Sequence, residues 1–202
     1  MKQVKLDDIL TIKVGTQSKL EVDEQSGYVV SVNLLTGKNI TDLGVLDLSN
    51  NELKQAYIKE RREKDSSEDI LKAEDIVLQA KGTNLRAALV SKQDEESSLI
   101  ASPSNFILGV NKELVLPEVI VAYFNSEYGQ QVLDSLNMGT GIKHVPAKRL
   151  KEIEITLPSI EKQSKIAEIF HQNIKVLRAI EALQAQQQKT MNAAIQQLMD
   201  KE

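Results

Sequence analysis

The chain has 202 residues, of which 41% are hydrophobic and 27% are charged, and it carries 25 Lys and Arg against 29 Asp and Glu. This length suffices for one ordinary globular domain with a helical extension and excludes a large multidomain enzyme. There is no Cys, and the only two His residues are His144 and His171, so disulfides, thiolate metal sites and multi-His zinc sites are excluded. Aromatic residues make up only 3% of the chain, which argues against a single-strand nucleic-acid surface built on stacked rings.

The start of the sequence, MKQVKLDDIL, lacks the continuous apolar stretch of a secretory signal. No window approaches the ~20 consecutive apolar residues of a membrane span. We therefore expect a cytoplasmic protein without membrane contact. The formal net charge of −4 argues against indiscriminate binding to polyanions, so any nucleic-acid contact must come from local basic clusters.

Residues 1–157 predict an α+β fold class, with short helices and strands mixed along the sequence. The apolar spacing of residues 6–12 favours a short helix that ends near Gly15. Residues 28–32, with the sequence Tyr-Val-Val-Ser-Val, favour a buried strand. Residues 51–64 are rich in charge and predict a helix with a solvated face.

Four short apolar runs with polar breaks between them predict further strands, at residues 76–80, 87–90, 99–101 and 106–110. Two helices are predicted after these strands. The first begins at Pro117 and runs through Phe124, and the second is capped by Ser126 and runs through Leu136. A last strand is predicted at residues 153–157.

Residues 159–200 contain neither Gly nor Pro and directly follow Pro158, which predicts one long helix with Ser159 as its N-cap. In heptad notation the run forms two columns three residues apart, as in a coiled coil with a polar middle. The first column holds Phe170, Leu177, Gln184, Met191 and Leu198. The second holds Ile166, Asn173, Ile180, Gln187 and Ala194, and Ile169, Val176 and Leu183 widen the stripe.

A helix of these 42 residues spans about 60 Å, which is longer than a domain of roughly 150 residues needs across its surface. Its apolar stripe therefore needs a second helix, and no other long helix is predicted in this chain. We expect a homodimer paired through this helix, although a terminal helix folded back over its own domain is the alternative. The residues expected on the pairing face are Ile166, Phe170, Leu177, Ile180, Leu183, Met191 and Leu198.

Motifs of catalytic chemistry are weak in this sequence. Gly37-Lys38 and residues 139–141, Gly-Thr-Gly, lack the full pattern of a phosphate or dinucleotide loop and are better explained as turns. A Ser-His-Asp hydrolase is not supported, because His171 falls on the long helix and no Ser lies in a nucleophile-elbow sequence. The acidic residues are scattered rather than grouped as metal ligands. We expect no catalytic residue and no metal site.

Three basic clusters could contact nucleic acid. In the first, Lys54, Lys59, Arg61, Arg62 and Lys64 fall within residues 51–64, where an ordinary solvated helix face is the alternative. The second is a turn between two predicted strands, which we expect to present Lys81, Thr83, Asn84 and Arg86. Such side chains contact phosphates and base edges, although a generic hairpin turn would have no such role.

The third cluster, residues 139–149, combines two Gly that permit close backbone approach to a phosphate with several cationic side chains. Its candidate contacts are Lys143, His144, Lys148 and Arg149. None of the three clusters is specific alone. We expect the protein to contact DNA through the second and third clusters and through Arg61 and Arg62 of the first.

The order of these elements resembles a specificity subunit of a Type I restriction-modification system, and in particular half of one. The resemblance is carried by residues 6–15, 74–82 with Arg86, 123–130, 139–144 and 153–166. The most telling part is the pattern I-x-L-P-x-x-E-x-Q-x-x-I, which runs from Ile155 to Ile166 at the step from the last strand into the long helix. The resemblance covers essentially the whole chain.

The resemblance implies a DNA-reading subunit without catalytic residues, with a target-recognition domain in residues 1–157 and a coiled-coil region in residues 158–202. In that family the helices hold two recognition domains apart and dock modification subunits that methylate adenine with S-adenosylmethionine. We therefore expect double-stranded DNA and a DNA adenine methyltransferase subunit as partners, no cofactor on this chain, and a restriction subunit as an open question. Family members carry two recognition domains, whereas this chain has room for one.

Two further hypotheses compete with this reading. A protein-binding adaptor that dimerises through the helix would not need DNA. An independent methyltransferase is disfavoured, because the sequence lacks an Asn/Asp-Pro-Pro-Tyr/Phe motif and a Gly-rich cofactor motif. The leading hypothesis is a sequence-specific DNA-binding subunit that directs an adenine methyltransferase to a bipartite target.

Overall fold

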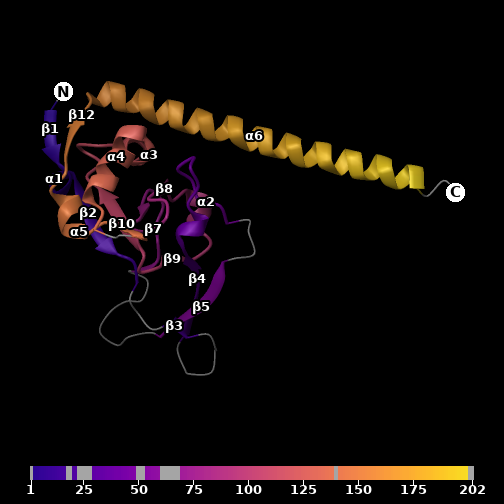
Figure 1. Cartoon of the computed structure of the whole chain (residues 1–202), viewed down its shortest axis with the longest axis horizontal. Coiled ribbons are helices and arrows are strands. Elements are labelled where there is room, and N and C mark those ends of the chain that lie inside the picture. The colour runs from indigo at the N-terminus through magenta and orange to yellow at the C-terminus, as the bar shows by residue number, and fades with distance from the viewer. Residues whose placement is uncertain are drawn as a thin grey trace.

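The computed structural model describes residues 2–16, 20–21, 29–48, 53–59, 69–138 and 141–199. A mixed domain of short strands and helices lies at one end of a single long helix, which runs out past the domain (Figure 1). This is the α+β class with a projecting helix that the sequence predicted. Among the described helices, none is both long and apolar enough to cross a membrane.

Two four-stranded sheets form the domain. The first is antiparallel, in the order β2 (Leu10–Val14), β10 (Asn105–Val110), β6 (Ile76–Gln79) and β8 (Ala87–Leu89). The second has the order β3 (Leu20–Glu21), β5 (Lys54–Lys59), β4 (Val29–Leu35) and β9 (Leu99–Ala101). Within it, β4 and β9 run parallel and the other pairs run antiparallel. The strands predicted around residues 28–32, 76–80, 87–90, 99–101 and 106–110 are all confirmed.

Strand β6 is covered on both faces, which explains its continuous apolar sequence. Ile76 and Leu78 belong to the core beneath the helices, whereas Val77 belongs to a second core between the two sheets. All three side chains are fully buried. The sheets are also joined by polar contacts, since buried Asn105 donates from Nδ2 to the carbonyl of Leu35 at 3.2 Å.

Helices α3 (Pro117–Asn125) and α4 (Glu127–Leu136) pack over the first sheet. Pro117 occupies the start of α3, where its missing N–H costs no helical hydrogen bond. Ser126 ends α3 and caps α4, because its Oγ accepts a hydrogen bond from the backbone N–H of Gly129 at 3.1 Å. Both predicted helices and the predicted cap are therefore confirmed.

Short elements complete the domain. Strand β1 (Lys2–Lys5) pairs antiparallel with β12 (Glu154–Leu157), the predicted last strand. Four short helices are α1 (Leu6–Ile9), η1 (Gly37–Asn39), α2 (Lys92–Glu95) and α5 (Ala147–Lys151). The pairing of β1 with β12 brings the start of the chain to the base of the long helix (Figure 1).

One predicted helix is too long, and another is wrong. Only Leu6–Ile9 is helical near the start of the chain, and from Leu10 onward the chain pairs with β10 as strand β2. In the predicted helix at residues 51–64, Lys54–Lys59 forms strand β5, which pairs with β4 and buries Ala56 in a small cluster with Val32 and Ile100. Backbone pairing and this apolar contact outweigh the local preference of a charged run for helix. Arg61, Arg62 and Lys64 lie outside the described residues.

The long helix α6 (Ile160–Met199) is confirmed. It is anchored by Gln163, whose side chain is only 2% exposed. Gln163 Oε1 accepts from the backbone N–H of Leu116 at 3.0 Å, and Nε2 donates to the carbonyl oxygens of Leu114 and Pro158, both at 3.1 Å. The conspicuous Gln of the sequence pattern therefore ties the helix to the segment that leads into α3.

Only part of the predicted coiled-coil seam is open. Ile166 and Phe170 pack against the domain's own core, and Ile174 and Leu177 are half-buried. By contrast, the neighbouring column is exposed, with Ile169 at 69%, Val176 at 56% and Leu183 at 68%. The domain therefore covers one side of the helix. The exposed apolar surface lies on a different side of the helix from the predicted seam. We call Ile169, Val176, Ile180 and Leu183 the α6 stripe.

Replacing Gln163 with Leu is expected to destabilise the fold by about 2 to 3 kcal/mol, because three backbone groups lose their partner while the side-chain volume is kept. Urea unfolding of the full chain measures this free energy. Gln172→Leu, at an exposed position of the same helix, is the matched control and should change stability by less than about 0.5 kcal/mol. Equal effects of the two variants would show that the anchor contributes nothing specific.

Candidate nucleic-acid interface

The structure joins the second and third basic clusters of the sequence. Strand β7 (Lys81–Gly82) pairs antiparallel with β11 (Lys143–His144), so that Lys81 lies opposite His144 and Gly82 opposite Lys143. About sixty residues separate the two strands in the sequence. We call this pair the β7–β11 ribbon, and it places both candidate loops on one surface.

The ribbon stands on a hydrogen-bonded base. The backbone N–H groups of Ala80 and Lys81 both donate to the carbonyl of Ser104, at 2.9 and 3.0 Å. On the other strand, the backbone N–H of His144 donates to Asn137 Oδ1 at 2.8 Å. Side chains carried by such a base keep a defined position, as recognition residues require.

Gly82 is required by the geometry of β7. Its φ of +156° is unfavourable for other residues, and a Cβ here would lie 2.0 Å from Gln79 Nε2. The amide of Gln79 also donates to the carbonyl of Lys81 at 3.3 Å. The Gln79 side chain therefore fills the space that only a glycine leaves open, and it fixes the course of the chain into the following turn.

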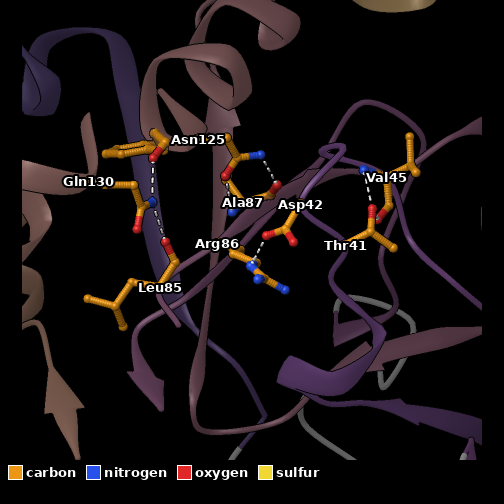
Figure 2. Close-up of polar contacts among 9 residues, drawn as sticks. Thr41, Asp42, Val45, Leu85, Arg86, Ala87, Asn125 and Gln130 are labelled. Atoms are coloured by element: carbon orange, nitrogen blue, oxygen red, sulfur yellow. Dashed lines mark hydrogen bonds and ion pairs between the residues drawn. The ribbon is translucent and has the colours of Figure 1, made fainter. Parts of the chain in front are cut away.

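The turn at residues 83–86 is held at its far end by two amides (Figure 2). Gln130 Nε2 donates to the carbonyl of Leu85 at 2.7 Å. Asn125 bonds to both backbone groups of Ala87, accepting from its N–H at 2.9 Å and donating to its carbonyl at 2.8 Å. Thr83 and Asn84, which directly precede Leu85, are exposed, which is the arrangement expected of a binding loop.

The sequence gives no individual role to Asn125 or Gln130, although both lie in the segment 123–130 that carries the family resemblance. Polar amides in the last turn of α3 and in the second turn of α4 face a strand edge rather than solvent. An edge strand needs such partners for its open backbone groups. This role cannot be read from sequence without knowing that β8 is an edge.

The cations of the interface differ in their partners. Arg86 forms an ion pair with Asp42 (Figure 2), and Lys143 Nζ lies 2.6 Å from Asp134 Oδ1. Both pairs are partly exposed, so they contribute little to folding and can exchange for another anion. Within the described residues, Lys81 and Lys148 have no carboxylate at ion-pair distance.

The remaining predicted site residues lie nearby or cannot be placed. Lys148 and Arg149 are exposed on α5, which begins three residues after β11. Arg61 and Arg62 fall outside the described residues. In the part of the chain that is described, no group of His, Cys, Asp and Glu is arranged to hold a metal ion.

Two described titratable groups outside the ribbon strands have shifted pKa values. Burial raises the pKa of Tyr123 in α3 to about 12, with a smaller contribution from Tyr128, so the phenol stays protonated at neutral pH. Burial also raises the pKa of Asp75, against the opposing hydrogen bond from the backbone N–H of Lys72.

Replacing Gly82 with Ala is expected to lower stability by about 1 to 3 kcal/mol, because the backbone angle is strained and the new Cβ meets Gln79. Thermal or urea unfolding measures the loss. Gly141→Ala, in the neighbouring loop, is the matched control, since a Cβ there has no atom within 4 Å. A Gly82→Ala variant as stable as this control would contradict the geometry of the ribbon.

Comparison with known proteins supports this architecture. Residues 1–189 match the family model described as Type I restriction modification DNA specificity domain. No curated protein shows a significant match. A chain in a solved structure entitled "Structural basis underlying complex assembly and conformational transition of the type I R-M system" is 18% identical, with a TM-score of 0.57, over 93% of this chain and 45% of that chain.

Two further solved structures are similar. The HsdS subunit from Thermoanaerobacter tengcongensis is 18% identical, with a TM-score of 0.55, over 93% of this chain and 45% of that subunit. A Type-I restriction-modification S subunit from M. genitalium is 15% identical, with a TM-score of 0.52, over 88% of this chain and 41% of that subunit. These likenesses show the fold, and the chain spans less than half the length of each. By the match over residues 1–189, the chain belongs to the family of Type I restriction modification DNA specificity domains.

Proposed function

We propose that this chain is a non-catalytic specificity subunit that reads a DNA sequence and directs an adenine methyltransferase subunit to it. The observation that carries the proposal is the pairing of β7 with β11, which unites two cationic loops on one fixed base. The family membership of residues 1–189 supports the same conclusion. S-adenosylmethionine would bind to the modification subunit and not to this chain.

The loops divide naturally between two kinds of DNA contact. Thr83 and Asn84 are short, exposed and uncharged, and such side chains hydrogen-bond to base edges. Lys81 and Lys148 would contact phosphates, which fixes the protein on the duplex without reading its sequence. Arg86 and Lys143 would exchange their carboxylate partners for DNA when the complex forms.

The α6 stripe supports a partner along the helix. The four aliphatic side chains of this stripe are exposed on one face of the helix, where the domain does not cover them. Such an apolar face is rarely left in contact with water. We propose a second copy of the chain, paired antiparallel, because this arrangement places one recognition domain at each end. An associated restriction subunit is compatible with the same architecture.

A protein-binding adaptor is the second candidate, and the same α6 stripe is the observation that favours it. An adaptor needs the helix but gains nothing from the cationic loops. Binding to DNA therefore separates the two functions. A steep fall of duplex affinity with salt is expected for a DNA reader and not for an adaptor.

Mapping of methylated adenines in cells that carry this chain and its modification partner tests the proposed function. Two identical domains related by a two-fold axis should read the same half-site on opposite strands, which predicts an inverted repeat with an unread spacer. Replacing Thr83 and Asn84 together with Ala should weaken binding to that motif by roughly tenfold or more while leaving random duplex unaffected. A non-palindromic motif would mean pairing with a different half-subunit, and no methylation at all would contradict the proposal.

Replacing Val176 and Leu183 together with Glu should convert the dimer to a monomer, because four charges would be buried in the helix pair. Light scattering at micromolar concentration measures the mass. Ala182→Glu with Ala193→Glu is the matched control, since both Ala are exposed on α6 but lie off the stripe. A wild-type chain that is monomeric under these conditions would contradict self-association.

A further inference from the structure

A cleft of about 730 Å³ opens beside the ribbon, at the junction of the two sheets. It is lined by side chains from both sheets and from the turns between them. The polar ones that matter are Lys38, Lys54 and Lys81, together with Thr36, Ser102 and Ser104. Lys81 belongs to the ribbon as well, so the cleft and the ribbon form one continuous surface.

The charge of this cleft is opposite to that of the chain. Among the described residues that line it there are three lysines and no carboxylate, whereas the whole chain has a formal net charge of −4. A cleft of about 560 Å³ between α6 and the domain contains Asp47, Asp94 and Glu181 against one Arg. A concave surface with one sign of charge concentrates its field and attracts a polyanion, even on an acidic protein.

Each lysine is carried by a fixed backbone. Lys54 opens strand β5 and pairs with Leu34 of β4. Lys81 lies in the ribbon. Lys38 lies in η1, where the backbone N–H of Thr36 donates to Oδ1 of the buried Asn39 at 3.0 Å. The three cations therefore come from three separate elements that the fold brings to one place.

Gln79 joins the cleft to the ribbon. Its side chain lies against Gly37 on one side and Gly82 on the other, and a Cβ at either glycine would fall within 2.3 Å of its Nε2. The η1 turn, which carries Lys38, is thereby held close to the start of the reading loop. A strand of DNA that presents its bases to Thr83 and Asn84 would have its backbone beside the cleft.

We propose that this cleft binds the phosphodiester backbone of the DNA strand next to the bases that the ribbon reads, with Lys38 and Lys54 as phosphate contacts. The inference rests on the proposed function and deepens it. Lysines with serine and threonine hydroxyls are the side chains that hold phosphate oxygens. Such contacts are independent of sequence, so Lys38 and Lys54 contribute affinity and the ribbon contributes specificity.

The test is a salt series with a random-sequence duplex, which needs no knowledge of the target. The full chain with its modification subunit is compared with the Lys38→Ala, Lys54→Ala double variant. Each lost phosphate contact should lower the slope of log K against log salt by about 0.9, hence by about 1.8 for the pair. Affinity near 0.15 M salt should fall roughly ten- to thirtyfold. Thermal stability should not change, because both lysines are exposed.

The control is Lys5→Ala with Lys92→Ala, two exposed lysines on β1 and α2 outside the cleft, which should leave both slope and affinity unchanged. A cleft variant with the slope of the wild type would overturn the inference and leave the proposed function standing. A loss confined to the methylated motif would also overturn it, because it would mean base reading. A wild-type complex without a salt-dependent affinity would overturn the proposed function and this inference together.

Discussion

The geometry of the molecule depends on the three hydrogen bonds of Gln163. A helix advances about 100° per residue, so fixing one side chain inward also fixes the direction of every other residue on α6. With Gln163 turned to the domain, Phe170 meets the core, while Ile169, Val176 and Leu183 point away from the domain by roughly 120° to 160°. One buried amide therefore determines which side of the helix packs against the domain and which side stays exposed.

The same device recurs at the recognition loops. Asn125 and Gln130 use side-chain amides to satisfy the backbone of β8 and of the turn before it, as Gln163 does for the segment before α3. A buried backbone group without a hydrogen-bond partner costs folding free energy. Each amide therefore favours the one backbone arrangement in which these groups are paired. Helices α3 and α4 thereby hold the turn that carries Thr83 and Asn84, and both of these side chains stay exposed.

Local patterns account for the elements that could be predicted. Strands β6 and β10 and helices α3, α4 and α6 are visible because apolar spacing, Pro117 and Ser126 act within a few residues. Strand β5 was missed because its charged sequence favours a helix and only pairing with β4 decides otherwise. The candidate residues of both loops could be chosen from composition. The pairing of the two loops could not be predicted, because two-residue strands about sixty positions apart leave no periodic signal in the sequence. Lys54 was assigned to a helix face and Lys38 to a simple turn, so their shared cleft emerges only from the fold.

Two cations of the candidate interface are already paired with carboxylates, which lowers the affinity for any DNA. On the proposed function, Arg86 and Lys143 are held by Asp42 and Asp134 until a competing anion displaces the carboxylate. On a random sequence, contacts to phosphates alone must supply the free energy that displaces these carboxylates. On the target sequence, the base contacts of the ribbon contribute further binding free energy. Specificity is the difference between these two sums, so a cost common to both leaves the specificity unchanged and weakens binding to target and random sites alike. On the proposed function, these ion pairs therefore weaken binding to all DNA, and the discrimination between sequences rests on the base contacts of the ribbon.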